Sequence, residues 1–148
     1  MKTVHKSVLL WYSPAQMYAL VTDVASYPQF LPWCDKAQVL QQDETGMTAE
    51  VGIAFGGIHQ SFTTRNTHTA PSQVDMQLLK GPFSNLDGQW FFLPVGDGSQ
   101  QASKVELSLR YGFSSATLGA VVGPVFDKIA ATLVEAFVKR AQQVYGDA

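Results

Sequence analysis

The sequence has little charge, one cysteine and no long apolar run. Only 15% of its 148 residues are Asp, Glu, Lys or Arg, whereas about 25% is usual in a soluble domain. A transmembrane helix needs about 20 consecutive apolar residues, so we expect no membrane span. Residues 1–14 lack the apolar run and the cleavage site of a signal peptide. Because a lone cysteine cannot form a disulfide within the chain, these absences together predict a cytoplasmic protein.

The sequence also lacks an excess of positive charge. Ten Lys and Arg residues stand against twelve Asp and Glu residues, which gives a net charge of −2. Proteins that hold nucleic acid through its phosphates cluster their cations, and here the cations are scattered along the chain. We therefore expect no DNA partner and no broad RNA-binding surface, while a small basic patch stays open as an alternative.

No arrangement typical of catalysis or metal binding is present. Cys34 has no histidine near it in the sequence, and a catalytic thiol needs a base, so we expect an ordinary buried thiol. The three histidines, His5, His59 and His68, lack the close spacing of a zinc pair. The motif FGGIHQ at 55–60 is typical of a hairpin turn and does not match a phosphate loop. The sequence thus predicts no catalytic residue, no metal, no required cofactor and no enzyme activity.

Apolar residues are plentiful by contrast. They make up 46% of the sequence, and a chain of this length can bury about 70% of its unfolded surface. We expect a single domain over residues 1–148. Its surplus of apolar residues must form a core, a lined cavity or a partner surface.

Two helices have clear signals. The motif SPAQ combines a capping Ser13 with a proline at the first helical position and the Gln16 of a capping box. This helix should end or turn at Pro28, because the residue before a proline avoids helical geometry. A second helix is predicted over 117–145, where the apolar stripe is wider than the roughly 100° of an ordinary surface helix.

A hairpin over 48–67 is the clearest β-structure. Gly56 and Gly57 suit a two-residue turn that needs positive φ angles. Pairing across this turn places Val51 opposite Phe62 on a mostly apolar face. Further strands are predicted at 3–11, 74–79, 86–94 and 104–113.

The order of these elements predicts an α+β fold. A strand, a helix, five or six antiparallel strands and a long helix follow one another, so strands and helices are segregated. A curved antiparallel sheet around the long C-terminal helix would bury the wide stripe. It would also leave a cavity between helix and sheet unless large side chains fill it.

Four stretches carry a resemblance to a known family. They are MYALVTDVASYPQFLPWC, SFTTRN, DMQLLKGPFSNLDGQWFF and FVKRAQQVY. Together with the element order, they resemble the helix-grip (START or Bet v 1-like) fold. More specifically, they resemble the coenzyme Q-binding START-like family, in the bacterial branch that includes the ribosome-association toxin. The resemblance covers essentially the whole chain.

The resemblance implies different functions in different branches. Yeast-type members imply ubiquinone binding in support of respiration, and the bacterial branch implies binding to the large ribosomal subunit and blocking of subunit joining. A looser link by fold to polyketide cyclases implies an enzyme. For that reading the predicted inward faces supply few polar groups, chiefly Gln60 and Thr64. Fold alone does not choose among these functions.

The leading expectation is a non-enzymatic START-like protein whose hydrophobic cavity holds ubiquinone or a similar lipid. The alternative is a toxin-type protein with the large ribosomal subunit as its partner, and a cyclase-like enzyme ranks third. The residues expected to line the cavity are Phe30, Trp33, Phe62, Met76, Trp90, Leu109, Tyr111, Phe126, Ile129 and Leu133.

The segment SYPQFLPWCDK, residues 26–36, is unusually apolar for a helix exit. Loops ordinarily use small polar residues, but this segment holds Tyr27, Phe30, Leu31 and Trp33. We expect it to cover the open end of the gap between sheet and helix. It then serves either as a plug of the core or as the mouth of a ligand cavity.

Two further predictions concern the surface. Phe91 and Leu93 should point outward from their strand and form either a partner patch or a surface that another segment or a second copy covers. Arg65 should form a surface ion pair with Glu50, worth below about 1 kcal/mol. Arg110 is expected to be paired in the same way.

Overall fold

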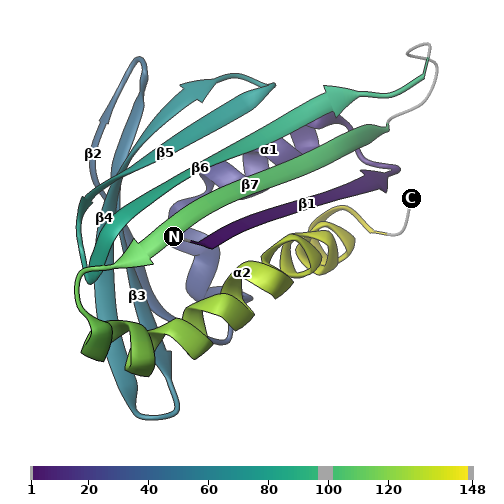
Figure 1. Cartoon of the computed structure of the whole chain (residues 1–148). Coiled ribbons are helices and arrows are strands. Elements are labelled where there is room, and N and C mark those ends of the chain that lie inside the picture. Colours follow the sequence, from purple (N-terminus) through teal and green to yellow (C-terminus); the bar gives the residue numbers. More distant parts are fainter. Residues whose placement is uncertain (1, 97–101, 147–148) are drawn as a thin grey trace.

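The computed structural model describes residues 2–96 and 102–146 and confirms the α+β fold (Figure 1). Within these ranges one antiparallel sheet has the strand order β1-β7-β6-β5-β4-β3-β2. The strands are β1 (Lys2–Leu10), β2 (Cys34–Asp43), β3 (Gly46–Phe55), β4 (Ile58–Thr69), β5 (Gln73–Lys80), β6 (Phe83–Pro94) and β7 (Ser103–Phe113). The helices are α1 (Pro14–Thr22), the 3-10 helix η1 (Val24–Gln29) and α2 (Ala116–Tyr145).

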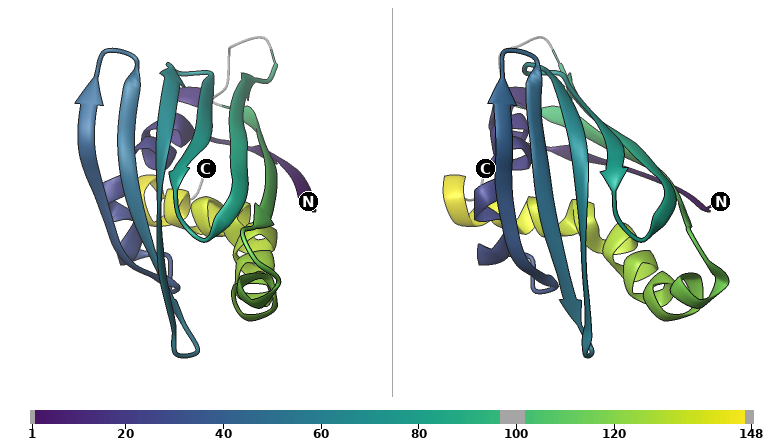
Figure 2. Two further views of the ribbon diagram at one scale, coloured as in Figure 1. Left: turned by 60° about the vertical axis from the view of Figure 1, so that its left-hand side comes forward. Right: turned by 90° about the vertical axis from the view of Figure 1, so that its left-hand side faces the viewer.

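The sheet is curved, and the three helices lie on its hollow side (Figure 2). Helix α2 crosses this side, while α1 packs against α2 and β6, and η1 packs beside β2. The buried residues of α2 include Val122, Phe126, Ile129, Val134 and Phe137. The wide apolar stripe of the C-terminal helix is therefore buried by the sheet, as the sequence predicts.

The local signals at α1 and at the hairpin are confirmed. The Gln16 backbone N–H donates to Ser13 Oγ at 3.1 Å, and the Ser13 N–H donates to Gln16 Oε1 at 2.8 Å, which completes the capping box. In the hairpin, Val51 stands opposite Phe62. The turn residues Gly56 and Gly57 have φ angles of 59° and 84°. Residues other than glycine adopt such positive φ angles only at a cost in free energy.

Strand β2 is the element that the sequence analysis did not assign. It is an edge strand, paired on one side only with β3, and its register shifts twice. Most of its residues are exposed, so its sequence lacks the apolar alternation by which a half-buried strand is predicted.

The structure shows which side chains of β1 and β6 face the core. On β1, Val4, Val8 and Leu10 pack against the core, whereas Leu9 is 70% exposed. On β6, the inward phase of Trp90 and Phe92 is confirmed, since both are buried. On the other phase Phe91 is half-buried and Leu93 is exposed.

Arg65 forms a surface ion pair as predicted, but its partner is Asp43 and not Glu50. Arg65 donates through Nη2 to both carboxylate oxygens of Asp43, at 2.9 and 3.0 Å, while Glu50 pairs with Lys36 at 3.2 Å. Asp43 and Lys36 both lie on the unassigned strand β2, which explains the error. The predicted kind of pair is present at Arg110, whose Nη2 lies 2.6 Å from Asp87 Oδ2.

Phe137 of α2 is the centre of an aromatic cluster. Its ring lies 5.6 Å from Tyr27, 5.2 Å from Phe30 and 5.3 Å from Trp90, each in an edge-on arrangement. Only 2% of Phe137 is exposed. The cluster joins the long helix to η1, to the chain just after it and to the middle of the sheet.

We expect Phe137→Ala to lower the free energy of unfolding by about 3–5 kcal/mol, because it removes a buried ring and leaves a cavity. Urea denaturation followed by circular dichroism measures the change. Val121→Ala on the same helix is the control, since Val121 is 51% exposed and should change stability by no more than about 0.5 kcal/mol. Equal effects of the two substitutions would contradict the proposed role of the cluster.

Candidate functional site

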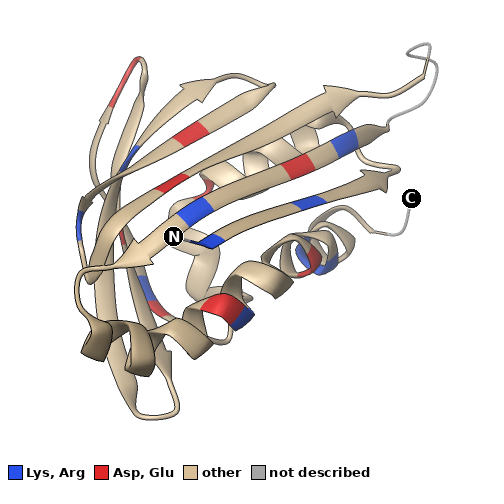
Figure 3. Ribbon diagram, in the orientation of Figure 1, with Lys and Arg blue, Asp and Glu red and all other residues tan. Residues whose placement is uncertain are grey.

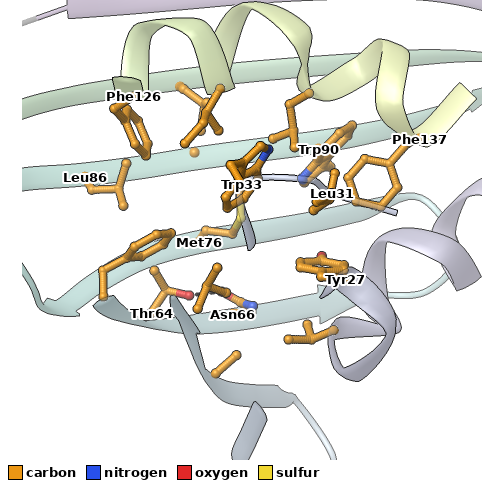
Figure 4. A pocket seen from close by; sticks show the side chains of 18 residues that line it. Tyr27, Leu31, Trp33, Thr64, Asn66, Met76, Leu86, Trp90, Phe126 and Phe137 are labelled. Carbon is orange, nitrogen blue, oxygen red and sulfur yellow. Dashed lines mark hydrogen bonds between the residues drawn. The ribbon is translucent and has the colours of Figure 1, made fainter. Parts of the chain in front are cut away.

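A cavity of about 90 Å³ lies between α2 and the hollow side of the sheet (Figure 4). Most of its wall is apolar, with contributions from α2, η1 and the segment after it, and the strands β3 to β7. The lining residues are Val24, Tyr27, Leu31, Trp33, Ala49, Val51, Phe62, Thr64, Asn66, Met76, Leu86, Gly88, Trp90, Leu109, Phe126, Ile129, Leu133 and Phe137.

Most of the residues predicted to line a cavity are brought together here. They are Trp33, Phe62, Met76, Trp90, Leu109, Phe126, Ile129 and Leu133. Alternation along the strands and the helical stripe place these side chains on the inner surface, except for Trp33, which was expected there from the apolar segment 26–36. Their role in binding a ligand stays a prediction.

Phe30 and Tyr111 do not line the cavity. The Phe30 ring packs on the outer side of Phe137, below the guanidinium of Arg140. Tyr111 points inward but is covered by the ring of Phe126 at 4.7 Å, and its hydroxyl donates to Asp127 Oδ1 at 2.6 Å. A side chain can therefore point toward the inner side of the sheet without lining the cavity, because the sequence pattern does not show how far along each strand or helix the cavity extends.

The polar part of the cavity wall comes from β4. Thr64 donates through Oγ1 to Asn66 Oδ1 at 2.8 Å, and both side chains are buried. The sequence analysis expected Thr64 to face inward but missed Asn66. The signal was available, because residues two apart on a strand share a face.

The segment 26–36 is both a plug and a wall. Tyr27, Leu31 and Trp33 line the cavity. Figure 4 shows Leu31 and Tyr27 near Phe137, and Trp33 in the middle of the cavity. Tyr27 is anchored because its hydroxyl donates to the carbonyl of Val21, and burial raises the pKa of this phenol well above its usual value. The apolar character of this helix exit therefore serves to close the core.

Apart from the Tyr27 phenol, the cavity wall carries no titratable side chain. None of its lining residues is Asp, Glu, His, Lys, Arg or Cys, and the described ranges contain no group of metal ligands. Cys34 is buried nearby, and its thiol donates to the Lys36 carbonyl at 3.3 Å. What the site can do chemically is to surround an apolar molecule and offer it one or two hydrogen bonds.

Within residues 2–96 and 102–146, no helix is both long enough and apolar enough to cross a membrane. This agrees with the lack of a long apolar run in the sequence.

The profile of a family described as "Polyketide cyclase / dehydrase and lipid transport" matches residues 10–138. The chain belongs to this family. It is 44% identical over 147 residues to a Vibrio cholerae protein named "Ribosome association toxin RatA", across 99% of this chain and 100% of that one. An Escherichia coli protein of the same name is 41% identical over 145 residues, across 98% of this chain and 90% of that one.

More distant similarities complete the comparison. A Xenopus laevis protein named "Coenzyme Q-binding protein COQ10 homolog B, mitochondrial" is 28% identical over 142 residues, across 95% of this chain and 58% of that one. The crystal structure of an aromatase/cyclase from a Streptomyces species has a TM-score of 0.83 over 99% of both chains at 13% identity, which shows the shared helix-grip fold. These findings confirm the resemblance seen in the sequence, with the bacterial branch nearer than the coenzyme Q-binding relative.

The environment of Cys34 predicts a slow reaction with alkylating agents. Burial, and then the negative charge of Asp35, raise the pKa of this thiol to about 11, and only the thiolate reacts. Because the thiol stays protonated below that pKa, its thiolate fraction at pH 8 is roughly one two-hundredth of that of an ordinary cysteine, whose pKa is about 8.5. Mass spectrometry of iodoacetamide labelling should show a rate still rising at about pH 10, whereas N-acetylcysteine approaches a plateau. A plateau for the protein near pH 9 would contradict the assigned environment.

Proposed function

We propose that this chain associates with the large ribosomal subunit and hinders the joining of the two subunits. The observation that carries the proposal is the 44% identity, over nearly the full length of both chains, with a protein named as a ribosome association toxin. The coenzyme Q-binding relative is more distant, at 28% identity. The ribosome-directed alternative from the sequence therefore ranks above the lipid-binding function, and it would act in the cytoplasm.

The proposed role needs no chemical step, and we propose that the chain is not an enzyme. General acid–base catalysis requires a titratable group within reach of the substrate. Tyr27 is the one such side chain in the cavity wall. Its hydroxyl already donates to Val21, and burial keeps it protonated. The cyclase-like reading consequently has the least support.

The size of the cavity weighs against a permanently bound quinone. Its volume is about 90 Å³, whereas an apolar cavity that accepts benzene in another protein measures about 150 Å³. A substituted quinone ring is larger than benzene. Lining side chains such as Trp33 would have to move before such a ring could enter.

Ribosome association is tested by centrifuging the purified chain through sucrose with separated ribosomal subunits. We expect it to sediment with the large subunit, to stay behind with the small subunit, and to reduce the yield of joined ribosomes when both are present. The absence of co-sedimentation even at low salt would overturn the proposed function. So would equal co-sedimentation with both subunits.

A second candidate function, binding of an apolar carbonyl compound, is favoured by Asn66. Its side-chain carbonyl accepts from Thr64, so the amide N–H groups are the donors that this side chain can offer to a ligand. The amide belongs to the cavity wall. A carbonyl oxygen of a quinone-type ligand in the cavity could accept a hydrogen bond from this amide.

We expect a short-chain ubiquinone analogue to quench tryptophan fluorescence in a saturable way, since Trp33 and Trp90 line the cavity. Asn66→Leu should weaken binding about fivefold, because a hydrogen bond of roughly 1 kcal/mol is lost. Ala49→Leu should abolish binding by filling the space. Val121→Leu, on the exposed side of α2, is the control. Quenching that is the same in all four proteins would show that the analogue binds elsewhere.

A further inference from the structure

The ten Lys and Arg side chains divide evenly between paired and unpaired groups. All ten lie in the described residues, and five form ion pairs: Lys2, Lys36, Arg65, Lys104 and Arg110. The other five form no ion pair with a carboxylate of residues 2–96 and 102–146. Three of these, Lys128, Lys139 and Arg140, lie on α2. Figure 3 shows positive and negative residues interspersed over the sheet and separate groups of charge along α2.

A groove of about 600 Å³ runs between the segment 28–33 and the second half of α2. Phe30 and Trp33 contribute aromatic surface to it, and Lys139 and Arg140 contribute positive charge. Glu135 is the single carboxylate in its lining. A chain with a net charge of −2 thus has a locally positive groove with an aromatic wall.

Arg140 is held in position for an anionic partner. Its guanidinium lies over the Phe30 ring, 5.0 Å from the centroid, and donates through Nη2 to Gln29 Oε1 at 2.9 Å. Its Nη1 also donates to Gln143 Oε1 at 3.5 Å. Since a guanidinium has five N–H donors, about three remain for a phosphate. Lys128, near the middle of α2, likewise lies over an aromatic ring, 5.4 Å from the centroid of Phe55.

We propose that this groove binds unpaired nucleotides of RNA in the large ribosomal subunit. The inference rests on the proposed function and assigns the surface that carries it. Bases of single-stranded RNA stack on aromatic rings and on guanidinium planes, and phosphates are bound by Lys and Arg. The groove places Phe30 and Trp33 beside Lys139 and Arg140. Lys128 and Lys139 lie about three turns apart on the same face of α2, so an RNA backbone can follow that face over roughly 16 Å.

The observations favour RNA over a membrane surface. Attraction to anionic lipid typically uses four to eight clustered cations, and interfacial helices insert protruding apolar side chains. Here the groove has two cations, and Phe30 and Trp33 are half-buried in its wall. Such rings cannot reach into a bilayer, whereas the Arg140 guanidinium that covers Phe30 offers a plane on which a base can stack.

The test compares two double variants that remove the same charge. Lys139→Gln with Arg140→Gln changes the groove. Lys104→Gln with Arg110→Gln changes β7, where both cations are already ion-paired. Binding to purified large subunits, and to protein-free RNA extracted from them, is measured over a range of salt concentrations. Thermal melting checks that both variants are folded.

The groove variant should bind both targets about tenfold more weakly. The slope of its log affinity against log salt concentration should become shallower by about 0.7 for each phosphate that it no longer binds. The β7 variant should bind like the wild type. Vesicles of equal parts phosphatidylglycerol and phosphatidylcholine should bind none of the three proteins.

The other outcomes are separable. If the wild type does not bind large subunits, the proposed function itself fails. If it binds and the two double variants bind alike, only the assignment of the groove is overturned. If subunits are bound through the groove but protein-free RNA is not, the partner is a ribosomal protein and the RNA proposal is wrong. Binding to vesicles that the groove variant loses would instead make the groove a membrane site.

Discussion

The rest of the structure depends on one constraint, which is that a single sheet must cover the wide apolar face of α2. The helix has 30 residues and is therefore about 45 Å long. Burial of apolar surface contributes roughly 25 cal/mol per Å², so the strands are stabilised when they curve toward the helix. The same curvature keeps the middle of the sheet away from the helix, and the cavity of about 90 Å³ is the space that the intervening side chains do not fill.

The apolar segment after α1 connects this core to the outer surface. Leu31 and Trp33 line the internal cavity and also the external groove beside α2. A ligand that enlarges the cavity by moving Trp33 therefore also reshapes the groove. The cavity and the groove thus share this wall.

Much of the fold could be predicted because its signals are local. The capping box at Ser13 and the glycine turn at 56–57 depend on residues that are close in the sequence. Alternation in 104–113 reports directly which side of the strand is buried. Strand β2 escaped prediction because it is an edge strand whose side chains are mostly exposed. Without β2, the partners of Arg65 and Glu50 could not be assigned.

The sequence by itself determined the fold class, the hairpin register, the inward phase of most cavity residues and the family. Each of these follows from short-range patterns or from motifs. Only the tertiary structure decided that Phe30 lies outside the cavity and that Asn66 lies within it. It also decided how small the cavity is and which cations remain unpaired along α2. These properties depend on side chains that are far apart in the sequence and meet only when the sheet curves around the helix.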